Sequence, residues 1–169
     1  MMVHTETGAL LHNDHVATIQ SLQSLEGFLV RQSSKRPPDT ADAGVRAMLQ
    51  GLIDTVSNEV GRHFGFEEQH LFPLLAERGE AGIGDFLMHE HATILPLANE
   101  VAESARQALE QGFDPTHWRR FHAIGLELAE REIFHIQKEE MGLLAAISML
   151  VDAAADKKLA AIYHSLKAA

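Results

Sequence analysis

Apolar residues recur at every third or fourth position along four long segments of the chain, a spacing typical of amphipathic helices. No run of five or more residues alternates strictly between apolar and polar, so strands are not favoured. The segments span about residues 10–31, 42–77, 85–111 and 114–150, and a shorter one follows at about 153–166. We therefore predict an all-α protein, an up-down-up-down antiparallel four-helix bundle with a short additional C-terminal helix. This last helix is expected to pack on the bundle or on another subunit.

The stretches between these segments contain residues that end or begin helices. Residues 33–40 include two adjacent prolines, and three glycines lie between residues 79 and 84. Asp114 followed by Pro115 predicts a helix N-cap with proline at the first helical position. Pro96 lies inside the third segment, where we expect a local bend. None of these breaks divides the core, so we expect residues 1–169 to form one domain.

Polar residues occur on the predicted inward faces, where apolar residues are expected. They are His15 on the first segment, His63 and Glu67 on the second, His91 on the third, and His135 and Glu139 on the fourth. Burying isolated carboxylates costs several kcal/mol each, so a bundle tolerates such a set only if its members pair or bind a metal. The chain also has 11 histidines, roughly three times the ordinary frequency. The sequence therefore predicts a metal site inside the bundle.

The inward residues follow a repeated pattern. His63 with Glu67, and His135 with Glu139, are four residues apart, so each pair lies on one helix face and directs a nitrogen and an oxygen to one point. Both pairs belong to HxxxEE sequences, and DHVATI in the first segment resembles EHATI in the third. We interpret the chain as two similar helical hairpins, each with one His on its first helix and HxxxEE on its second. The inward faces are predicted to continue through Leu71 and Leu74 in the first hairpin, and through Gly142 or Leu143 and then Ala146 in the second.

The helical periodicity also predicts which way the other polar residues near these positions point. Glu68 and Glu140 are each rotated by about 100° from the preceding glutamate, so we expect them to contact water, lysine or arginine. His12 and Glu90 are candidates for additional ligands or for residues that contact the ligands, whereas His89 is expected to point elsewhere. The remaining histidines are interpreted as surface or rim residues: His70, His117, His122 and His164.

The composition excludes several classes of site and partner. The chain has no cysteine, which excludes disulfides, zinc fingers and cysteine-bound iron–sulfur clusters. Its 14 Lys and Arg against 24 Asp and Glu give a net charge of −10, which disfavours binding to nucleic acid and anionic membranes. Neither a signal peptide nor an apolar stretch of about 18 residues is evident. We therefore expect a soluble cytoplasmic protein with neither nucleic-acid nor membrane partners.

Four short sequences around the inward histidines resemble the hemerythrin-like HHE cation-binding family, over roughly residues 10–150. They are the DH pair at His15, HFGFEEQHLFP from His63 to Pro73, the EH pair at His91, and HIQKEE from His135. The resemblance implies two non-haem iron ions, with the four histidines as terminal ligands and Glu67 and Glu139 as bridging carboxylates. It also implies an oxo or hydroxo bridge. Imidazole and carboxylate ligands suit zinc or manganese as well as iron.

The sequence departs from the oxygen-carrying hemerythrins, which have HxxxH on the third helix and HxxxxD on the fourth. Here Leu95 lies four residues after His91, and the carboxylate of the fourth helix is Glu139. The chain is more similar to the four-His, two-Glu branch, which includes nitric-oxide-responsive, iron-sensing and iron–sulfur-repair proteins. Repair members often have an extra N-terminal cysteine domain, so the absence of cysteine makes the repair role less favoured.

Several functions fit this resemblance. The favoured one is a non-catalytic di-iron protein that binds or senses a small ligand, O₂ or NO, or holds iron, and a small anion such as azide should bind there too. The first alternative is an oxidoreductase acting on peroxide or NO, with His12, Glu90 or Tyr163 as proton donors. The second alternative is a bundle held by structural zinc, and the third is a bundle without metal. A homodimer is the expected alternative to a monomer.

Overall fold

The computed structural model describes residues 5–169, except for the side chains of residues 58 and 59. In this part of the chain the regular elements are all helical, and three of them, labelled η, are π-helical turns. They are α1 (Glu6–Arg31); α2 (Ala43–Asp54), η1 (Thr55–Val60), α3 (Gly61–Phe66), η2 (Glu67–Leu71) and α4 (Phe72–Glu77), which follow one another without a break; α5 (Gly82–Gln111); α6 (Pro115–Lys138), η3 (Glu139–Leu143) and α7 (Leu144–Leu150), again without a break; and α8 (Ala153–Ala168). No helix within residues 5–169 is long and apolar enough to cross a lipid bilayer.

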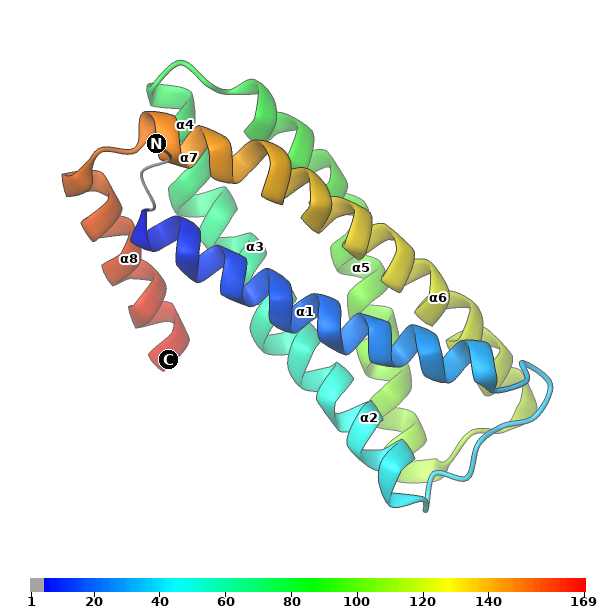
Figure 1. Cartoon of the computed structure of the whole chain (residues 1–169). Helices are drawn as coiled ribbons and strands as arrows, with labels where there is room; N and C mark the ends of the chain where they lie inside the picture. The colour runs from blue at the N-terminus through cyan, green and yellow to red at the C-terminus, as the bar shows by residue number, and fades with distance from the viewer. Residues whose placement is uncertain (1–4) are drawn as a thin grey trace.

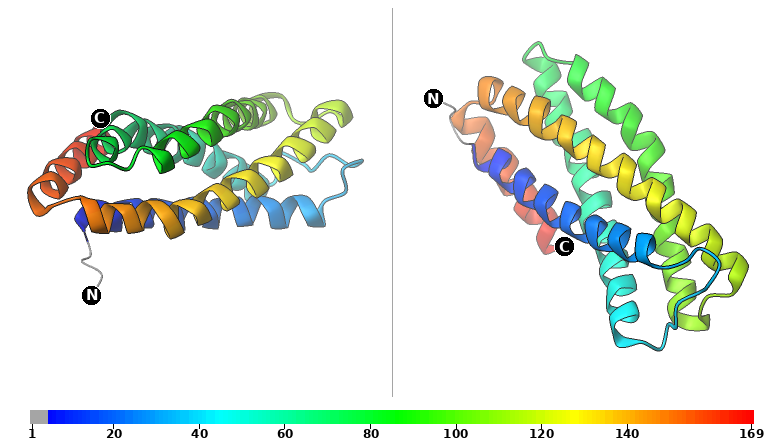
Figure 2. Two further views of the ribbon diagram at one scale, coloured as in Figure 1. Left: turned by 90° about the horizontal axis from the view of Figure 1, so that it is seen from above. Right: turned by 45° about the vertical axis from the view of Figure 1, so that its right-hand side comes forward.

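The long helices pack as a closed ring, in which α1 contacts α2 and α6, and α5 contacts the same two helices. Successive long helices run in opposite directions, as Figures 1 and 2 show. The predicted all-α antiparallel four-helix bundle is therefore confirmed. α5 continues through Pro96 as one helix, and the bend expected there stays a prediction.

Side chains at the N-cap positions account for where four of the helices begin. Thr5, Asp42, Asp114 and Asp152 each accept a hydrogen bond from a backbone N–H two or three residues later, at the starts of α1, α2, α6 and α8. Such caps satisfy N–H groups that have no partner within the helix. Pro115 follows Asp114 at the first position of α6, as predicted.

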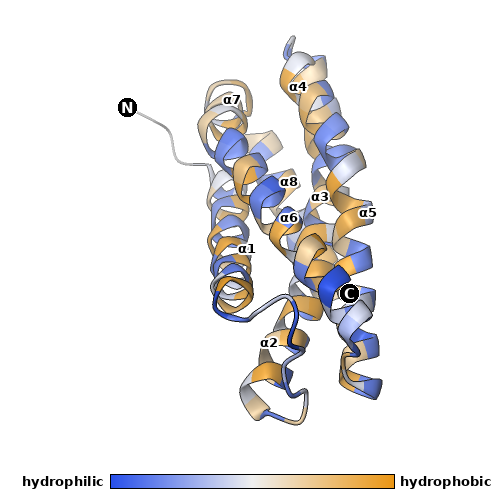
Figure 3. Cartoon of the chain, turned by 90° about the vertical axis from the view of Figure 1, so that its right-hand side faces the viewer, coloured by the Kyte–Doolittle hydropathy of each residue, from blue (hydrophilic) through white to orange (hydrophobic). Residues whose placement is uncertain are grey.

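Two apolar clusters fill the bundle, one on each side of a layer of buried polar residues. Along α5, Ile94 belongs to the first cluster and Leu87 to the second, with His91 between them. Along α1, Leu22 belongs to the first cluster and Leu11 to the second. Figure 3 shows the interleaving of hydrophobic and hydrophilic residues on these helices. The polar layer is therefore enclosed by apolar side chains at both ends, which keeps bulk water away from it.

A π-helical turn follows each inward glutamate. In η2 the backbone N–H of Phe72 donates to the carbonyl of Glu67, and in η3 the N–H of Leu144 donates to the carbonyl of Glu139. Each bond spans five residues, one more than in an α-helix. Pro73 directly follows the first of these bonds and has no N–H to donate, which favours an interruption of the α-helical ladder there.

These wider turns shift the inward face of the helix by one residue. The α-helical spacing predicted Leu74 and Ala146 at inward positions, but the structure buries Leu75 and Ile147 completely. Leu74 and Ala146 are only partly buried. Both predictions were wrong by one position because each π turn adds a residue before the chain faces inward again. At the preceding inward position of the second hairpin, Leu143 is the buried residue.

The last helix packs on the bundle. α8 contacts α1 and α3, and it lies across one end of the long helices in Figure 1. Leu159 and Tyr163 are buried there, while Ile162 and Leu166 pack, partly buried, against the second apolar cluster. Of the two positions expected for this helix, the bundle surface is the one observed.

Candidate metal centre

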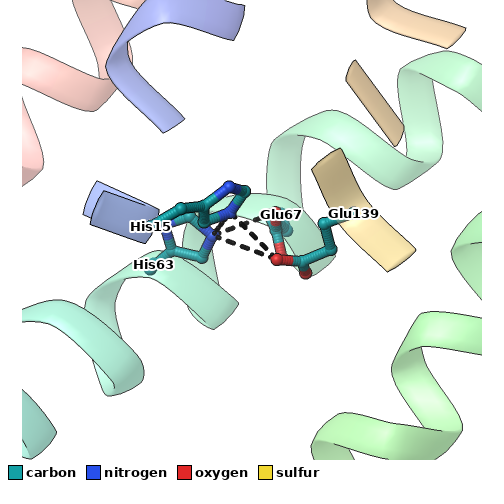
Figure 4. A group of neighbouring side chains, drawn as sticks. All are labelled: His15, His63, Glu67 and Glu139. Atoms are coloured by element: carbon teal, nitrogen blue, oxygen red, sulfur yellow. Dashed lines mark hydrogen bonds and ion pairs between the residues drawn. The ribbon is translucent and has the colours of Figure 1, made fainter. Parts of the chain in front are cut away.

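The six inward polar residues predicted from the sequence meet in the layer between the apolar clusters. They come from α1 (His15), α3 (His63), η2 (Glu67), α5 (His91), α6 (His135) and η3 (Glu139). None of these residues is more than 5% exposed. In Figure 4, His15 and His63 point from their helices towards the carboxylates of Glu67 and Glu139.

The histidines form two pairs, one from each hairpin. His15 Nε2 lies 3.2 Å from His63 Nε2 in the first pair, and His91 Nε2 lies 3.0 Å from His135 Nε2 in the second. Two nitrogens this close either share one hydrogen or direct two lone pairs at a common cation. The pairs correspond to the two hairpins of the repeated sequence pattern.

Glu67 lies between the two pairs. Its Oε1 lies 3.1 Å from Nε2 of His63 in the first pair, and its Oε2 lies 3.4 Å from Nε2 of His91 in the second. The glutamate comes from η2, at the point where the π turn begins. One carboxylate from the first hairpin therefore reaches histidines of both hairpins.

Glu139 has the corresponding position in the other hairpin. Its Oε2 lies 2.9 Å from Nε2 of His15, and its Oε1 lies 2.8 Å from Nε2 of His135. Each of the two glutamates thus presents one oxygen to each histidine pair. A carboxylate that bridges two metal ions requires this arrangement of its oxygens.

The four oxygens of Glu67 and Glu139 are buried, and none has an aligned hydrogen-bond partner among the described residues. Imidazole nitrogens lie near them at ion-pair distance, but leaving buried carboxylate oxygens without hydrogen bonds is costly. Two groups of donor atoms converge within 4.8 Å of one another: those of His15, His63, Glu67 and Glu139, and those of His91, His135 and Glu139. Nitrogen and oxygen donors grouped in this way fit a metal-binding site.

The outer nitrogen, Nδ1, of each histidine also contacts a carboxylate. In the first hairpin Asp14 Oδ2 lies 3.2 Å from Nδ1 of His63, and in the second Glu90 Oε2 lies 2.9 Å from Nδ1 of His135. Lys138 donates a hydrogen bond to the other oxygen of Glu90. A carboxylate on Nδ1 fixes the ring orientation and leaves Nε2 free to bind metal. Glu90 thus contacts a predicted ligand, while Asp14 was not identified from the sequence.

The other two carboxylates cross from one hairpin to the other. Glu140 Oε1 lies 2.5 Å from Nδ1 of His15, and Glu68 Oε1 lies 2.8 Å from Nδ1 of His91. Glu68 and Glu140 were expected to contact water, lysine or arginine. Their side chains are 36% and 30% exposed, but the expectation missed the histidine that each one contacts. Helix phase correctly turned them away from the inner cluster, but in a closed ring of helices that direction leads to the neighbouring helix.

The C-terminal helix adds two groups to this outer ring. The Tyr163 hydroxyl donates a hydrogen bond to Asp14 Oδ2, and Lys167 Nζ lies 3.4 Å from Asp14 Oδ1. Both residues belong to α8. Tyr163, expected as a proton donor in the enzymatic alternative, therefore lies next to Asp14 and is connected through it to His63.

The pKa values of the inner residues reflect their mutual contacts. Burial lowers the pKa of His135, but contacts with Glu139 outweigh it and raise the value to about 9. Burial opposes charge on His63 as well, and the neighbouring Glu67 raises its pKa well above the usual range. Burial favours the neutral form of Glu139, yet close contacts with the histidines hold its pKa well below the usual range. In the metal-free protein, protonated imidazoles therefore provide the positive charge that bound metal ions would replace.

One buried carboxyl at this level was not identified from the sequence. Glu132 is 3% exposed and lies in α6, one turn before His135 and one turn after Leu128. Burial raises its pKa to about 7. Its helix phase matches that of the inward residues, so the same spacing that predicted His135 and Glu139 was sufficient to predict it.

The remaining histidines lie outside the inner cluster. His12 is exposed, and its Nδ1 lies 2.9 Å from Glu140 Oε2, so it contacts the outer ring and does not reach the inner donor atoms. His89 is exposed and contacts the carbonyl of Asp85. The four histidines expected at the surface or rim are exposed or partly exposed: His70, His117, His122 and His164.

Comparison with known proteins gives one family for the chain. The family model described as the Hemerythrin HHE cation binding domain matches residues 8–147. The match includes all six inner residues and ends before α8. The search of curated proteins found no match.

Proposed function

Because the chain belongs to the hemerythrin HHE cation-binding domain family, we propose that it is a non-haem di-iron protein that binds or senses a small ligand, O₂ or NO, or holds iron. One observation supports two ions more than any other. Each inner glutamate directs one oxygen to the first histidine pair and the other oxygen to the second pair. Two ions, each at one pair, would give both carboxylates a full set of partners.

The ligand types support iron. Four imidazoles and two carboxylates without thiolate suit iron, with manganese and zinc as the alternatives. When bound, ferrous iron supplies the electrons that binding of O₂ or NO requires. The two carboxylates neutralise only part of the charge of two divalent ions, so the remaining positive charge would favour small anions as well.

The surrounding residues of the chain orient the ligands and exclude water. The ring of Phe64 stacks on His91 with the centroids 3.7 Å apart and the planes 6° from parallel. Glu68 holds the Nδ1 side of the same imidazole. Each histidine is thus fixed by at least one outer contact, which is a condition for tight metal binding.

Metal analysis of freshly purified protein, together with its visible spectrum, tests this proposal. We expect about two irons per chain from iron-replete cells, and near-ultraviolet absorption of the oxidised form that is bleached by dithionite. A colourless protein with two zinc ions would favour the structural alternative. Less than half an equivalent of any transition metal, in protein never exposed to a chelator, would refute a metal centre.

An oxidoreductase acting on peroxide or NO is the second candidate function. The buried carboxyl of Glu132 supports it, because a group with a pKa of about 7 can exchange a proton at neutral pH. A turnover assay with hydrogen peroxide and with NO distinguishes the two candidates. Binding without turnover would favour the sensor or iron-holding role.

The proposal includes a cytoplasmic protein without nucleic-acid or membrane partners. The net charge of −10 supports the absence of these two kinds of partner, because it disfavours association with phosphate groups. A homodimer remains the alternative to a monomer, and the molecular mass in solution distinguishes them.

A further inference from the structure

Glu132 occupies an inward position that an apolar residue would fill in an ordinary bundle. It follows Leu128 by four residues and precedes His135 by three, so all three lie on one face of α6. Leu128 belongs to the first apolar cluster, and His135 belongs to the metal centre. Glu132 therefore lies at the boundary between the metal centre and the first cluster.

The carboxyl of Glu132 has no structural partner that explains its burial. Its Oε2 is buried and has no hydrogen-bond partner among the described residues. Glu132 is not an outer partner of the histidines either. Those positions are taken by Asp14, Glu68, Glu90 and Glu140. An unpaired buried carboxyl costs more free energy than leucine at this position, so a structural role alone does not account for it.

Glu132 is also distinct from the inner ligand set. The two groups of converging donor atoms contain Glu67 and Glu139 but not Glu132. Four titratable groups act electrostatically on its carboxyl. His135 and Glu139 lie on the same continuous helix, α6 and η3, while His63 lies on α3 and His91 on α5. It therefore lies near both histidine pairs without joining either group.

We propose that Glu132 donates a hydrogen bond to a small anion held at the metal centre. A carboxylic acid O–H is a donor, whereas a carboxylate is not. Burial raises the pKa of this carboxyl in the metal-free protein to about 7, which favours the protonated form that can donate. The inference rests on the proposed metal function and specifies the class of ligand. Ligands with an anionic or basic atom would bind more tightly than neutral ligands, which accept hydrogen bonds weakly.

The test uses azide and iron-loaded protein. The variants are Glu132→Leu, which suits an apolar inward position, and Glu132→Gln, which keeps the shape and an N–H donor. Glu130→Gln, an exposed carboxylate on the same helix, is the control. Azide affinity is measured from the visible absorption at about pH 6 and about pH 8.5, to compare conditions that favour the protonated and the ionised carboxyl. The infrared stretch of bound azide reports the hydrogen bond directly.

At about pH 6 we expect Glu132→Leu to weaken azide binding about tenfold and to shift the azide stretch, because one hydrogen bond to a charged group is lost. Glu132→Gln should restore most of the affinity. At about pH 8.5 the advantage of the wild type should disappear or reverse, because an ionised Glu132 repels the anion. Glu130→Gln should match the wild type at both pH values.

Equal azide affinities of the wild type and Glu132→Leu at both pH values, with an unchanged stretch, would overturn the inference. Loss of iron from Glu132→Leu would overturn it as well, because Glu132 would then be a ligand. These failures differ from failure of the proposed function, in which the wild type itself would lack metal.

Discussion

Glu140 Oε1 lies 2.5 Å from Nδ1 of His15, although the two residues are 125 positions apart in the chain. Glu140 follows the inner Glu139, so one short stretch of the second hairpin supplies both an inner oxygen and the outer contact of a histidine from the first. Glu68 contacts His91 in the reverse direction. The orientation of His15 and His91 therefore depends on the two hairpins being packed together.

We predict that Glu140→Gln and Glu68→Gln weaken metal binding about 10- to 100-fold, because each removes the anionic partner of a histidine ligand. Glu67→Ala and Glu139→Ala should lose most of one or both metals, since each carboxylate faces both histidine pairs. Competition with a chelator measures the affinities. Glu26→Gln, an exposed carboxylate on α1, is the control and should bind metal like the wild type. Full metal content in Glu139→Ala together with loss in Glu140→Gln would contradict the inner and outer assignments.

The helical periodicity of the sequence was sufficient to predict the inner residues. All six lie before η2 and η3 or at the first residue of one of them, and His63 and Glu67, which follow η1, still lie at their predicted inward positions. Beyond those turns the same spacing failed, at Leu74 and Ala146. A single proline, Pro73, is a weak signal for such a turn, and the second hairpin has no proline there.

The outer contacts were harder to predict from the sequence. Periodicity gives the direction of a side chain relative to its own helix, but not the helix that it meets. Glu68 and Glu140 point away from the inner cluster and still meet a histidine, because neighbouring helices cover that side. Predicting the contacts of Asp14 would also require the position of α8, since Tyr163 contacts Asp14 from that helix.

The shift of the inward face predicts a difference between two adjacent leucines. Leu75 is completely buried and Leu74 is partly buried. Leu75→Ala should therefore destabilise the protein by about 2–5 kcal/mol, whereas Leu74→Ala should cost clearly less. Denaturant unfolding of the metal-free protein measures both, without a contribution from metal binding. A larger loss for Leu74→Ala would mean that η2 does not shift the register.

The contact of α8 with Asp14 predicts a role for Tyr163 in holding a ligand. Tyr163→Phe removes the hydroxyl that donates to Asp14 but keeps the buried ring. We expect stability to fall by about 1 kcal/mol, and metal affinity to fall by less than in Glu140→Gln, because Asp14 still contacts His63. Ser165→Ala, an exposed position of the same helix, is the control. Unchanged metal affinity with a lower Tm would show that α8 contributes stability alone.

The last prediction concerns the pH dependence of the metal-free protein. The pKa of His135 rises from an ordinary value near 6.5 to about 9 on folding, so its contribution to stability is complete below about pH 6.5 and is lost as the pH rises towards 9. The pKa of Glu132 rises from 4.5 to about 7, so its ionisation destabilises the fold progressively over that interval. Together the two groups lower the stability of the metal-free protein as the pH rises from about 4.5 to about 9.

The stabilisation that bound metal provides should instead increase with pH, because protons on the histidine and glutamate ligands compete with the metal at low pH and are absent at high pH. Metal bound only by the folded state adds about 4 kcal/mol at a thousandfold excess over Kd. We therefore expect the Tm of the metal-loaded protein to exceed that of the metal-free protein by several degrees at about pH 7.5, and the difference to narrow towards pH 5.5. Scanning calorimetry of both forms across this range measures it, and Glu132→Gln should flatten the metal-free curve below about pH 7. Coincident Tm values at about pH 7.5 would mean that the inner residues do not couple metal binding to folding.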